Sequence, residues 1–447
     1  MRGFPPAIKG APALLFALLS MMLFLGGCGK VSEIFDAGSM FAHSPKPATG
    51  TDEGGEAASV VIEAPGSTPT PSPSPEPVKS PAPVAVRTPH SLPGESRLAP
   101  AVDAAAEQVM RDAVLTEDTV WRGEVLVEGS ITVAPQTTLT LEPGTVVRFR
   151  RTAPGEGAGP VLLVQGRIVA KGSAGEPVRF TSAFPDPGAG EWQGIILLGS
   201  EKKNLFEQCR VEGAVAGIDA SFSTITLKDV SMSACGTGAR FQDSIITVDG
   251  GEASGCRVGM ELAESEADVR NITVRGNRLG MMVRGGALFM EGGRFVANKQ
   301  AGLTASSSRF SIASAIFRDN VTGLAVTDCT GKVTASRVSD NRDVGIHLVR
   351  SRVQVNGNEI VSNGAIGLRV EDGLGVAWGN AFSGNGSFDI ENAGGEDFRA
   401  MANWWGEPSP LLGKRLNHRP QDPARGRVLV NPLLKARPPL RSLNPVP

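Results

Sequence analysis

Two aspartates occupy the same position of a repeating pattern, and an arginine lies close to each. Together these side chains could do acid–base chemistry. Asp319 and Asp340 each directly precede an asparagine, with Arg318 and Arg342 close by. On adjacent turns of a coil the two carboxylates would lie about 5 Å apart, a separation at which paired acids can bind a cation or act on a glycosidic bond. Basic residues crowd the same stretch, so a pair of solvated surface charges is the alternative interpretation.

The other side chains limit the available chemistry. Tyrosine is absent from the 447 residues, which excludes a tyrosine acid or base. His347 occupies an outward strand position in Gly-Ile-His-Leu, where its neighbours in register are Ala325 and Arg369 and not a carboxylate. The cysteines have no metal-ligand spacing, so we expect no metal and no cofactor. These observations favour a protein that is not an enzyme, with a lyase or hydrolase of acidic glycans as the alternative.

Charge is distributed unevenly along the chain. Residues 270–352 contain 13 Lys/Arg against 5 Asp/Glu, whereas residues 353–410 contain 2 Arg against 8 acids. Stacking would align several basic residues into a stripe about 20–25 Å long, which could bind a polyanion. The candidate anion-binding residues are Arg257, Arg275, Arg278, Lys299, Arg318 and Arg342. An ordinary solvated surface is the alternative, and the net charge of −2 gives no indication of nucleic-acid binding.

A regular repeat must position these residues. Glycines at positions 217, 238, 259, 280, 302, 323, 345 and 367 are separated by steps of 21 or 22 residues. Each is followed by alternating apolar residues, which is typical of a strand, and each unit is too short for several strands and a helix. Such self-similarity is the pattern of a solenoid whose turns stack in parallel at about 4.8 Å.

Stacked polar residues mark one corner of each predicted turn. We expect their side chains to point inward and to hydrogen-bond one another along the coil. The positions of this predicted ladder are Cys235, Cys256, Asn277, Asn298, Asn320, Asn341, Asn363 and Asn385. Cys235 and Cys256 would lie within disulfide range, with two stacked buried thiols as the alternative.

The sequence resembles the right-handed parallel β-helix proteins with pectate-lyase-like coils. The resemblance rests on the repeat, on an opening stretch that includes TVWRGEVLVEGSITV (119–133), and on ANWWGEPSP (402–410) near the end. It implies an all-β fold, a single right-handed parallel β-helix of about a dozen rungs over residues 119–410, and a C-terminal cap and tail over 411–447. The secreted members include NosD-like proteins, which implies a periplasmic accessory role in metal-site maturation as a further alternative.

The N-terminal residues predict how the coil is anchored. An apolar run ends in LGGC at 25–28, which resembles the lipobox of bacterial lipoproteins and implies a signal peptide at 1–27 and an acylated Cys28. Residues 28–41 would be the lipidated N-terminus. The Pro/Ser/Ala-rich residues 42–100 cannot bury enough apolar surface to fold, so they predict a disordered tether. Gly29 is not aspartate, which favours the outer membrane by resemblance to the enteric sorting rule.

A short capping helix is predicted at residues 101–118. Asp103 would be its N-cap, and Val109, Met110 and Val114 would share one face. Together these interpretations predict a non-catalytic lipoprotein of the cell envelope, anchored in a lipid membrane. It would present a rigid surface to an acidic polysaccharide or to another envelope protein.

Overall fold

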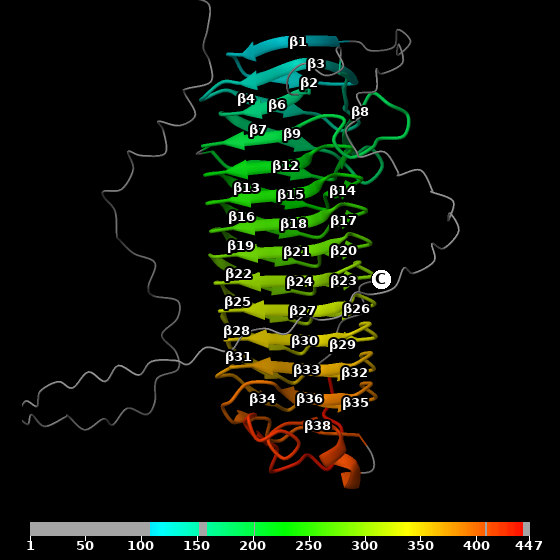
Figure 1. Ribbon diagram of the computed structural model, residues 1–447. Coiled ribbons are helices and arrows are strands. Elements are labelled where there is room, and N and C mark those ends of the chain that lie inside the picture. The colour runs from blue at the N-terminus through cyan, green and yellow to red at the C-terminus, as the bar shows by residue number, and fades with distance from the viewer. Residues whose placement is uncertain (1–107, 152–158, 201, 407–408, 441–447) are drawn as a thin grey trace, which may run out of the picture. The chain divides into compact units, whose positions relative to one another are not determined.

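The computed structural model describes residues 108–151, 159–200, 202–406 and 409–440. The predicted signal peptide, Cys28, the tether and the first part of the predicted capping helix lie outside these residues. The described chain forms 39 short strands, all paired in parallel, which wind into a solenoid of about 13 turns (Figure 1). The sequence prediction of an all-β parallel coil is therefore confirmed.

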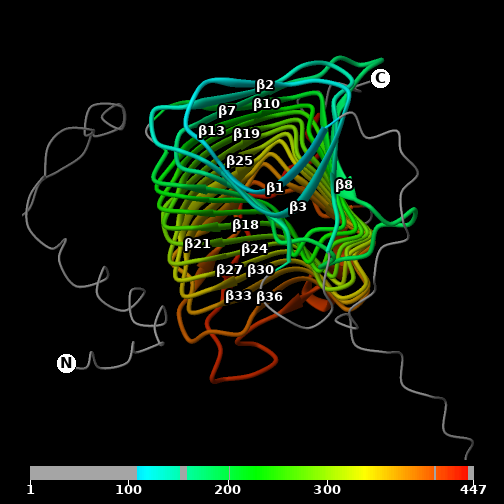
Figure 2. The same cartoon turned by 90° about the horizontal axis from the view of Figure 1, so that it is seen from above.

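Each turn, or rung, contributes one strand to each of three faces, as the view along the coil shows (Figure 2). Faces A and B belong to a 25-stranded sheet that bends at a corner, and face C is a separate 14-stranded sheet. The long strand β3 (Glu124–Val133) joins A and B, because its first half pairs with β5 and its second half with β6.

The strands stack in chain order on each face. Face A consists of β6 (Val161–Val164), β9 (Gly194–Leu198), β12 (Ala216–Ser221), β15 (Thr237–Gln242), β18 (Val258–Ala263), β21 (Leu279–Arg284), β24 (Ala301–Ser306), β27 (Thr322–Thr327), β30 (Val344–Val349), β33 (Ile366–Glu371), β36 (Phe388–Asn392) and β38 (Leu416–Asn417). Face B consists of β5 (Val146–Phe149), β8 (Val178–Ser182), β11 (Cys209–Glu212), β14 (Ser231–Ser233), β17 (Glu252–Ser254), β20 (Thr273–Arg275), β23 (Arg294–Val296), β26 (Ile316–Arg318), β29 (Arg337–Ser339), β32 (Glu359–Val361) and β35 (Ala381–Ser383).

Face C consists of β2 (Thr119–Trp121), β4 (Thr138–Leu141), β7 (Arg167–Lys171), β10 (Asn204–Glu207), β13 (Thr224–Lys228), β16 (Ile245–Asp249), β19 (Glu266–Arg270), β22 (Ala287–Glu291), β25 (Arg309–Ala313), β28 (Thr330–Thr334), β31 (Arg352–Asn356), β34 (Val376–Trp378), β37 (Phe398–Arg399) and β39 (Val428–Leu429). Strands of this length alternate inward and outward residues, so each rung sends apolar side chains into one continuous core. Phe295 and Phe317 stack in that core with ring centroids 4.9 Å apart.

Three sharp corners close each rung. At most of them a residue with positive φ is followed by a residue that points inward. Between faces B and A this inward residue belongs to the ladder that the spacing predicted. Asn298 donates from its backbone N–H and from Nδ2 to Oδ1 of Asn320, both at 3.0 Å, and Asn320 donates likewise to Asn341 at 3.1 Å. The inward amides thus satisfy each other and the backbone inside the core.

The ladder ends in an ion pair near the bottom of the coil. Asn385 donates to Oδ1 of Asp389 at 2.7 Å, and Asp389 is fully buried. Arg415 donates to both carboxylate oxygens of Asp389, at 2.9 Å and 2.7 Å. The last asparagine is therefore capped by a residue of face A and by an arginine from the C-terminal segment.

The other two corners have inward polar residues that the repeat analysis missed. Between faces C and B, Asn358 donates to Asn380 and Asn380 donates to Asn403 through short hydrogen bonds. Between faces A and C the same place is held mainly by serines: the backbone N–H of Ser223 donates to Ser244, and that of Ser244 to Ser265, both at 3.1 Å. Stacked polar residues therefore line the corner between faces B and A, most of the corner between faces A and C, and the last rungs of the corner between faces C and B, whose earlier inward positions include Val230, Ile272 and Ala315.

The predicted capping helix is wrong where the structure describes it. Residues 108–115 form strand β1 (Gln108–Leu115), which pairs in parallel along β3 with a bulge between Arg111 and Ala113. Met110, Ala113 and Leu115 pack against the core, whereas Val109 and Val114 are 46% and 61% exposed. The open edge of β3 needs backbone partners, and this requirement overrides the helical propensity of the segment.

Helical geometry within the described residues is confined to the 3-10 turn η1 (Ser409–Lys414). Neither this turn nor any other described segment is a helix of the length and apolar character needed to cross a bilayer.

We predict that replacing Asn320 by alanine destabilises the coil by at least about 2 kcal/mol. The substitution removes the acceptor for Asn298 and the amide that donates to the Phe295 carbonyl at 3.0 Å, leaving buried polar groups without partners. The free energy of unfolding is measured by urea denaturation. The outward-facing Asn356→Ala is the control and should change it by less than about 0.5 kcal/mol. Equal effects of the two substitutions would contradict a stabilising ladder.

Candidate functional site

Four cationic side chains follow the ladder residues at the corner between faces B and A. We call Arg257, Arg278, Lys299 and Arg342 the basic corner; all four are exposed. The first three stand on successive rungs, Val321 takes the position on the next rung, and Arg342 follows. Backbone hydrogen bonds fix this register: the N–H of Arg278 donates to the Cys256 carbonyl at 3.0 Å, and Lys299 and Arg342 donate in the same way to Asn277 and Asn320.

None of the four makes an ion pair with another residue that the structure describes. Three neighbouring arginines of face B differ in this respect. Arg275 lies 2.8 Å from Glu252, Arg318 lies 2.9 Å from Asp319, and Arg337 lies 3.1 Å from Glu359. Two of the predicted anion-binding residues, Arg275 and Arg318, therefore already have a carboxylate partner.

The backbone conformation bears on Asp319 and Asp340, the two candidate catalytic residues. Both are exposed and have positive φ, 61° and 56°, at the corner position that precedes the ladder. The equivalent residues of other rungs have positive φ as well: Gly213, Ala234, Gly255, Gly276, Ala297, Ser362 and Gly384. Aspartate is one of the few residue types besides glycine that adopts this conformation readily. The corner conformation is therefore sufficient to account for an aspartate at each of these two positions.

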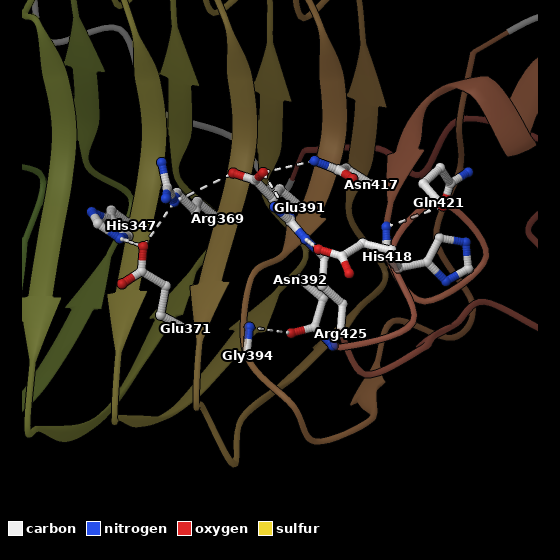
Figure 3. Close-up of polar contacts among 11 residues, drawn as sticks. His347, Arg369, Glu371, Glu391, Asn392, Gly394, Asn417, His418, Gln421 and Arg425 are labelled. Atoms are coloured by element: carbon white, nitrogen blue, oxygen red, sulfur yellow. Dashed lines mark hydrogen bonds and ion pairs between the residues drawn. The ribbon is translucent and has the colours of Figure 1, made fainter. Parts of the chain in front are cut away.

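A second polar cluster lies on face A near the C-terminal end of the coil (Figure 3). Sequence register placed only Ala325 and Arg369 beside His347, and both are its Cα partners. His347 nevertheless contacts a carboxylate, because Glu371 reaches back diagonally and places Oε1 3.2 Å from Nε2. Residues two apart on the next rung can meet when one side chain is long, which register alone does not reveal.

The cluster is compensated internally. The Nε atom of Arg369 lies 2.9 Å from Glu371 and 3.3 Å from Glu391. Glu391, only 7% exposed, also accepts from Asn417 at 2.7 Å and from Arg425 at 2.9 Å. Glu391 thus joins face A to the C-terminal segment. The acidic and basic side chains of the cluster already pair with one another, so the cluster has little free positive charge to attract an anionic ligand.

A further row of alternating charges lies higher on face A. Arg240 is 3.1 Å from Asp219 and 3.6 Å from Glu261, and Glu261 also pairs with Arg284. Burial raises the pKa of Asp219, and the nearby Arg240 opposes that effect. This row is an outward ion ladder, because residues of alternating sign stand in register on adjacent rungs.

The four described cysteines are buried free thiols. Cys235 and Cys256 occupy adjacent ladder positions, so the structure has the stacked-thiol arrangement and no disulfide between them. The hydrogen bond with Cys256, together with burial, raises the pKa of Cys235 and keeps its thiol protonated. Burial raises the pKa of Cys209 to about 12. Among the described residues, no group of three or more His, Cys, Asp or Glu could hold a metal ion.

Comparison with known proteins identifies the fold family. Residues 258–400 match the family model described as "Right handed beta helix region", and residues 110–229 match "Pectate-lyase like beta helix domain". The chain is a right-handed β-helix protein. No curated protein sequence matches it.

Solved structures similar to this β-helix protein have low identity. A mutant of the periplasmic alginate epimerase AlgG is 13% identical, covers 70% of this chain and 78% of its own, and has a TM-score of 0.37. The A-module of the mannuronan C-5 epimerase AlgE6 from Azotobacter vinelandii is 12% identical, covers 71% and 91%, and has a TM-score of 0.22. Pectate lyase Pel9A is 12% identical, covers 68% and 71%, and has a TM-score of 0.26. Similarity at this level does not bear on activity.

Some surface features of the β-helix were missed from the sequence. Arg294 is exposed at the start of β23, between Thr273 and Ile316 in register, and has no ion-pair partner among the described residues. Its outward position follows from the two-residue alternation with the buried Phe295, so the signal was present in the strand pattern.

We predict that acid weakens the C-terminal end of the β-helix through His418. Burial lowers the pKa of His418, and its Nδ1 accepts the Val428 N–H at 3.1 Å, which requires the neutral ring. The unfolded chain therefore binds the proton first, and stability falls as the pH decreases through about 6.5 toward the lower folded value. His418→Gln cannot be protonated and is the control. The wild type should lose more thermal stability than this variant between pH 7.5 and 5.5; equal losses would contradict the role of His418.

Proposed function

We propose that this β-helix binds an acidic polysaccharide along the basic corner and does so without catalysis. The observation that supports the proposal most is the set of four exposed cations on one corner, none of which is neutralised by a carboxylate of the described chain. Three arginines of the adjacent face B, Arg275, Arg318 and Arg337, are each paired with a carboxylate, whereas Arg294 on that face resembles the basic corner in having no such partner among the described residues. Unpaired cations in a row attract a polyanion.

The spacing of the basic corner suits a linear polymer. Arg257 and Arg342 are four rungs apart, a distance of roughly 19 Å at about 4.8 Å per rung. The parallel backbone hydrogen bonds hold these positions rigidly, so little ordering of the protein backbone is required on binding. The large exposed aromatic residues of the described chain, Phe222 and Phe289, lie elsewhere, and stacking on neutral sugars is therefore not a feature of the basic corner.

We further propose that the coil is carried by a lipoprotein of the cell envelope, in the outer membrane. LGGC at 25–28 supports acylation of Cys28, and the composition of residues 42–100 supports a long tether between lipid and coil. Two or more acyl chains would anchor the protein stably.

Replacing Cys28 by serine tests the anchor. The substitution should abolish incorporation of radiolabelled palmitate and move the protein from the membrane fraction to the soluble fraction of expressing bacteria. Cys209→Ser, which removes a buried thiol of the coil, is the matched control and should leave both properties unchanged. Continued labelling of the Cys28 variant would refute lipidation at this residue.

We predict that the triple substitution R278A/K299A/R342A weakens binding to a polyuronate about tenfold at low salt. The estimate takes about 0.5 kcal/mol for each lost surface charge interaction. The control R122A/R350A/R427A removes the same net charge but alters exposed arginines that already pair with Glu142, Asp328 and Asp397. It should change the affinity by less than about threefold. Affinities are measured by isothermal titration calorimetry at two salt concentrations, because screening should weaken the interaction.

Three outcomes would change the proposal. Equal losses in the two triple variants would show that binding depends on overall charge and not on the basic corner. Absence of binding to any acidic polymer would leave an envelope protein as the better partner. Depolymerisation during the titration would favour the enzyme alternative, for which His347 with Glu371 is the pair to replace first.

A further inference from the structure

The outward surface of face C divides into an acidic half and a basic half. On strands β16, β19 and β22 the first, third and fifth residues point outward, and they include four acids and one arginine: Asp249, Glu266, Asp268, Glu291 and Arg270. On β25, β28 and β31 the equivalent positions carry Arg309, Lys332 and Arg352 and no acid. Three adjacent rungs thus carry a net charge of −3 and the next three carry +3.

Most of these charges lack an ion-pair partner among the residues that the structure describes. Asp268 and Arg270 pair at 2.8 Å. The other six make no ion pair with any residue in the described parts of the chain. Ile245, 57% exposed, and Phe289, 45% exposed, add apolar surface between the charges. The described surface of face C is therefore partly apolar and carries separate zones of opposite sign.

We propose that face C is the contact surface of an antiparallel dimer of this chain. A twofold axis parallel to the strands, midway between β22 and β25, makes the surface complementary to itself. It places β25 on the partner copy's β22, β28 on its β19, and β31 on its β16. Self-complementary contact of one patch with itself is the usual interface of a symmetric dimer.

The register fixes which side chains would meet. Asp268 and Lys332 occupy the same outward file, as Asp268 pairs in register with Phe289, Phe289 with Ser311 and Ser311 with Lys332. The dimer axis therefore sets Lys332 against Asp268 of the partner copy. Glu266 would face Thr330, with Arg309 and Arg352 one rung to either side, about 4.8 Å away.

The same register excludes the other simple arrangement. If the axis ran along the coil, each rung would face its own copy, and Asp268 would meet Asp268 while Lys332 would meet Lys332. Such like-charge contacts cost several kcal/mol. In the antiparallel arrangement no two like charges face each other directly, because Arg309, Arg352, Asp249 and Glu291 stand opposite Ala287, Ile245, Asn356 and Ala313. The charge pattern thus selects one orientation.

Face C lies away from the corner between faces A and B (Figure 2). An antiparallel dimer would therefore leave the basic corner of both copies exposed, on opposite sides of the assembly. The inference does not depend on the proposed polysaccharide binding.

Complementary charge reversal tests the dimer with the full chain. R309E/K332E/R352E makes both halves of face C acidic, and E266K/D268K makes the acidic half basic. Sedimentation equilibrium should give twice the mass of one chain for the wild type, and each variant alone should dissociate at least about 100-fold more readily. Mixed in equal amounts, the two variants should form a dimer again. R257E/R278E/R342E carries the same number of reversals on the basic corner and should dimerise like the wild type.

Recovery of the dimer in the mixture cannot arise from misfolded variants, since both must fold for their surfaces to match. The proposal would be overturned if the wild type stayed monomeric from the lowest protein concentration that the assay detects to about 100 times that concentration. A dimer that persists unchanged in both reversal variants would overturn it as well, because the contact would then lie on another face.

Discussion

The coil depends on the polar residues that point inward at many of its corners. A rung must turn three times, and each turn leaves backbone groups that the neighbouring strands cannot pair. The asparagines and serines that follow the positive-φ residues donate to, or accept from, the adjacent rung, as Asn298, Asn320 and Asn341 do. Since a buried polar group without a partner costs on the order of 1–3 kcal/mol, these ladders are what allow a coil of short strands to close around an apolar core.

The stack has a direct consequence for the surface. When the interior repeats in register, the exterior repeats with it, so any residue type that recurs at one position becomes a row. The same constraint produces the basic corner, the alternating row from Asp219 to Arg284, and the two halves of face C. The rows differ in whether their charges are neutralised by neighbouring side chains. The charges of the face A row form ion pairs with one another, whereas those of the basic corner form none with the described residues.

The sequence predicted those parts of the fold that follow from the repeat. The steps of 21 and 22 residues define the rungs and the ladder from Asn277 to Asn385, and they align Arg257, Arg278 and Lys299 because each directly follows a ladder residue. Features outside that period could not be predicted. Strand β1 forms because the edge of β3 requires a partner, although its residues Val109, Met110 and Val114 also fit a helix. The corner between faces C and B, with Asn358, Asn380 and Asn403, spans too few rungs to show as a pattern.

The candidate site was only partly predictable for related reasons. Register places residues along one file, but it does not say where a long side chain ends. Glu371 therefore reaches His347 across a diagonal, and Arg318 folds onto its own neighbour Asp319, and neither contact follows from spacing. The positive φ of Asp319 and Asp340 does not follow from spacing either, and it is a backbone reason for the residue type that also suggests acid–base chemistry.

Arginine footprinting is the most direct test of the claim that stacking turns the corner into a binding surface. The protein is labelled with an arginine-specific dicarbonyl reagent, with and without a polyuronate, and the modified sites are read by mass spectrometry. Polymer binding at the corner predicts protection of Arg257, Arg278 and Arg342, whereas Arg309 and Arg352, which lie on face C and also have no ion-pair partner among the described residues, should react alike in both samples. Equal reactivity of the three corner arginines in both samples, or protection confined to face C, would contradict it.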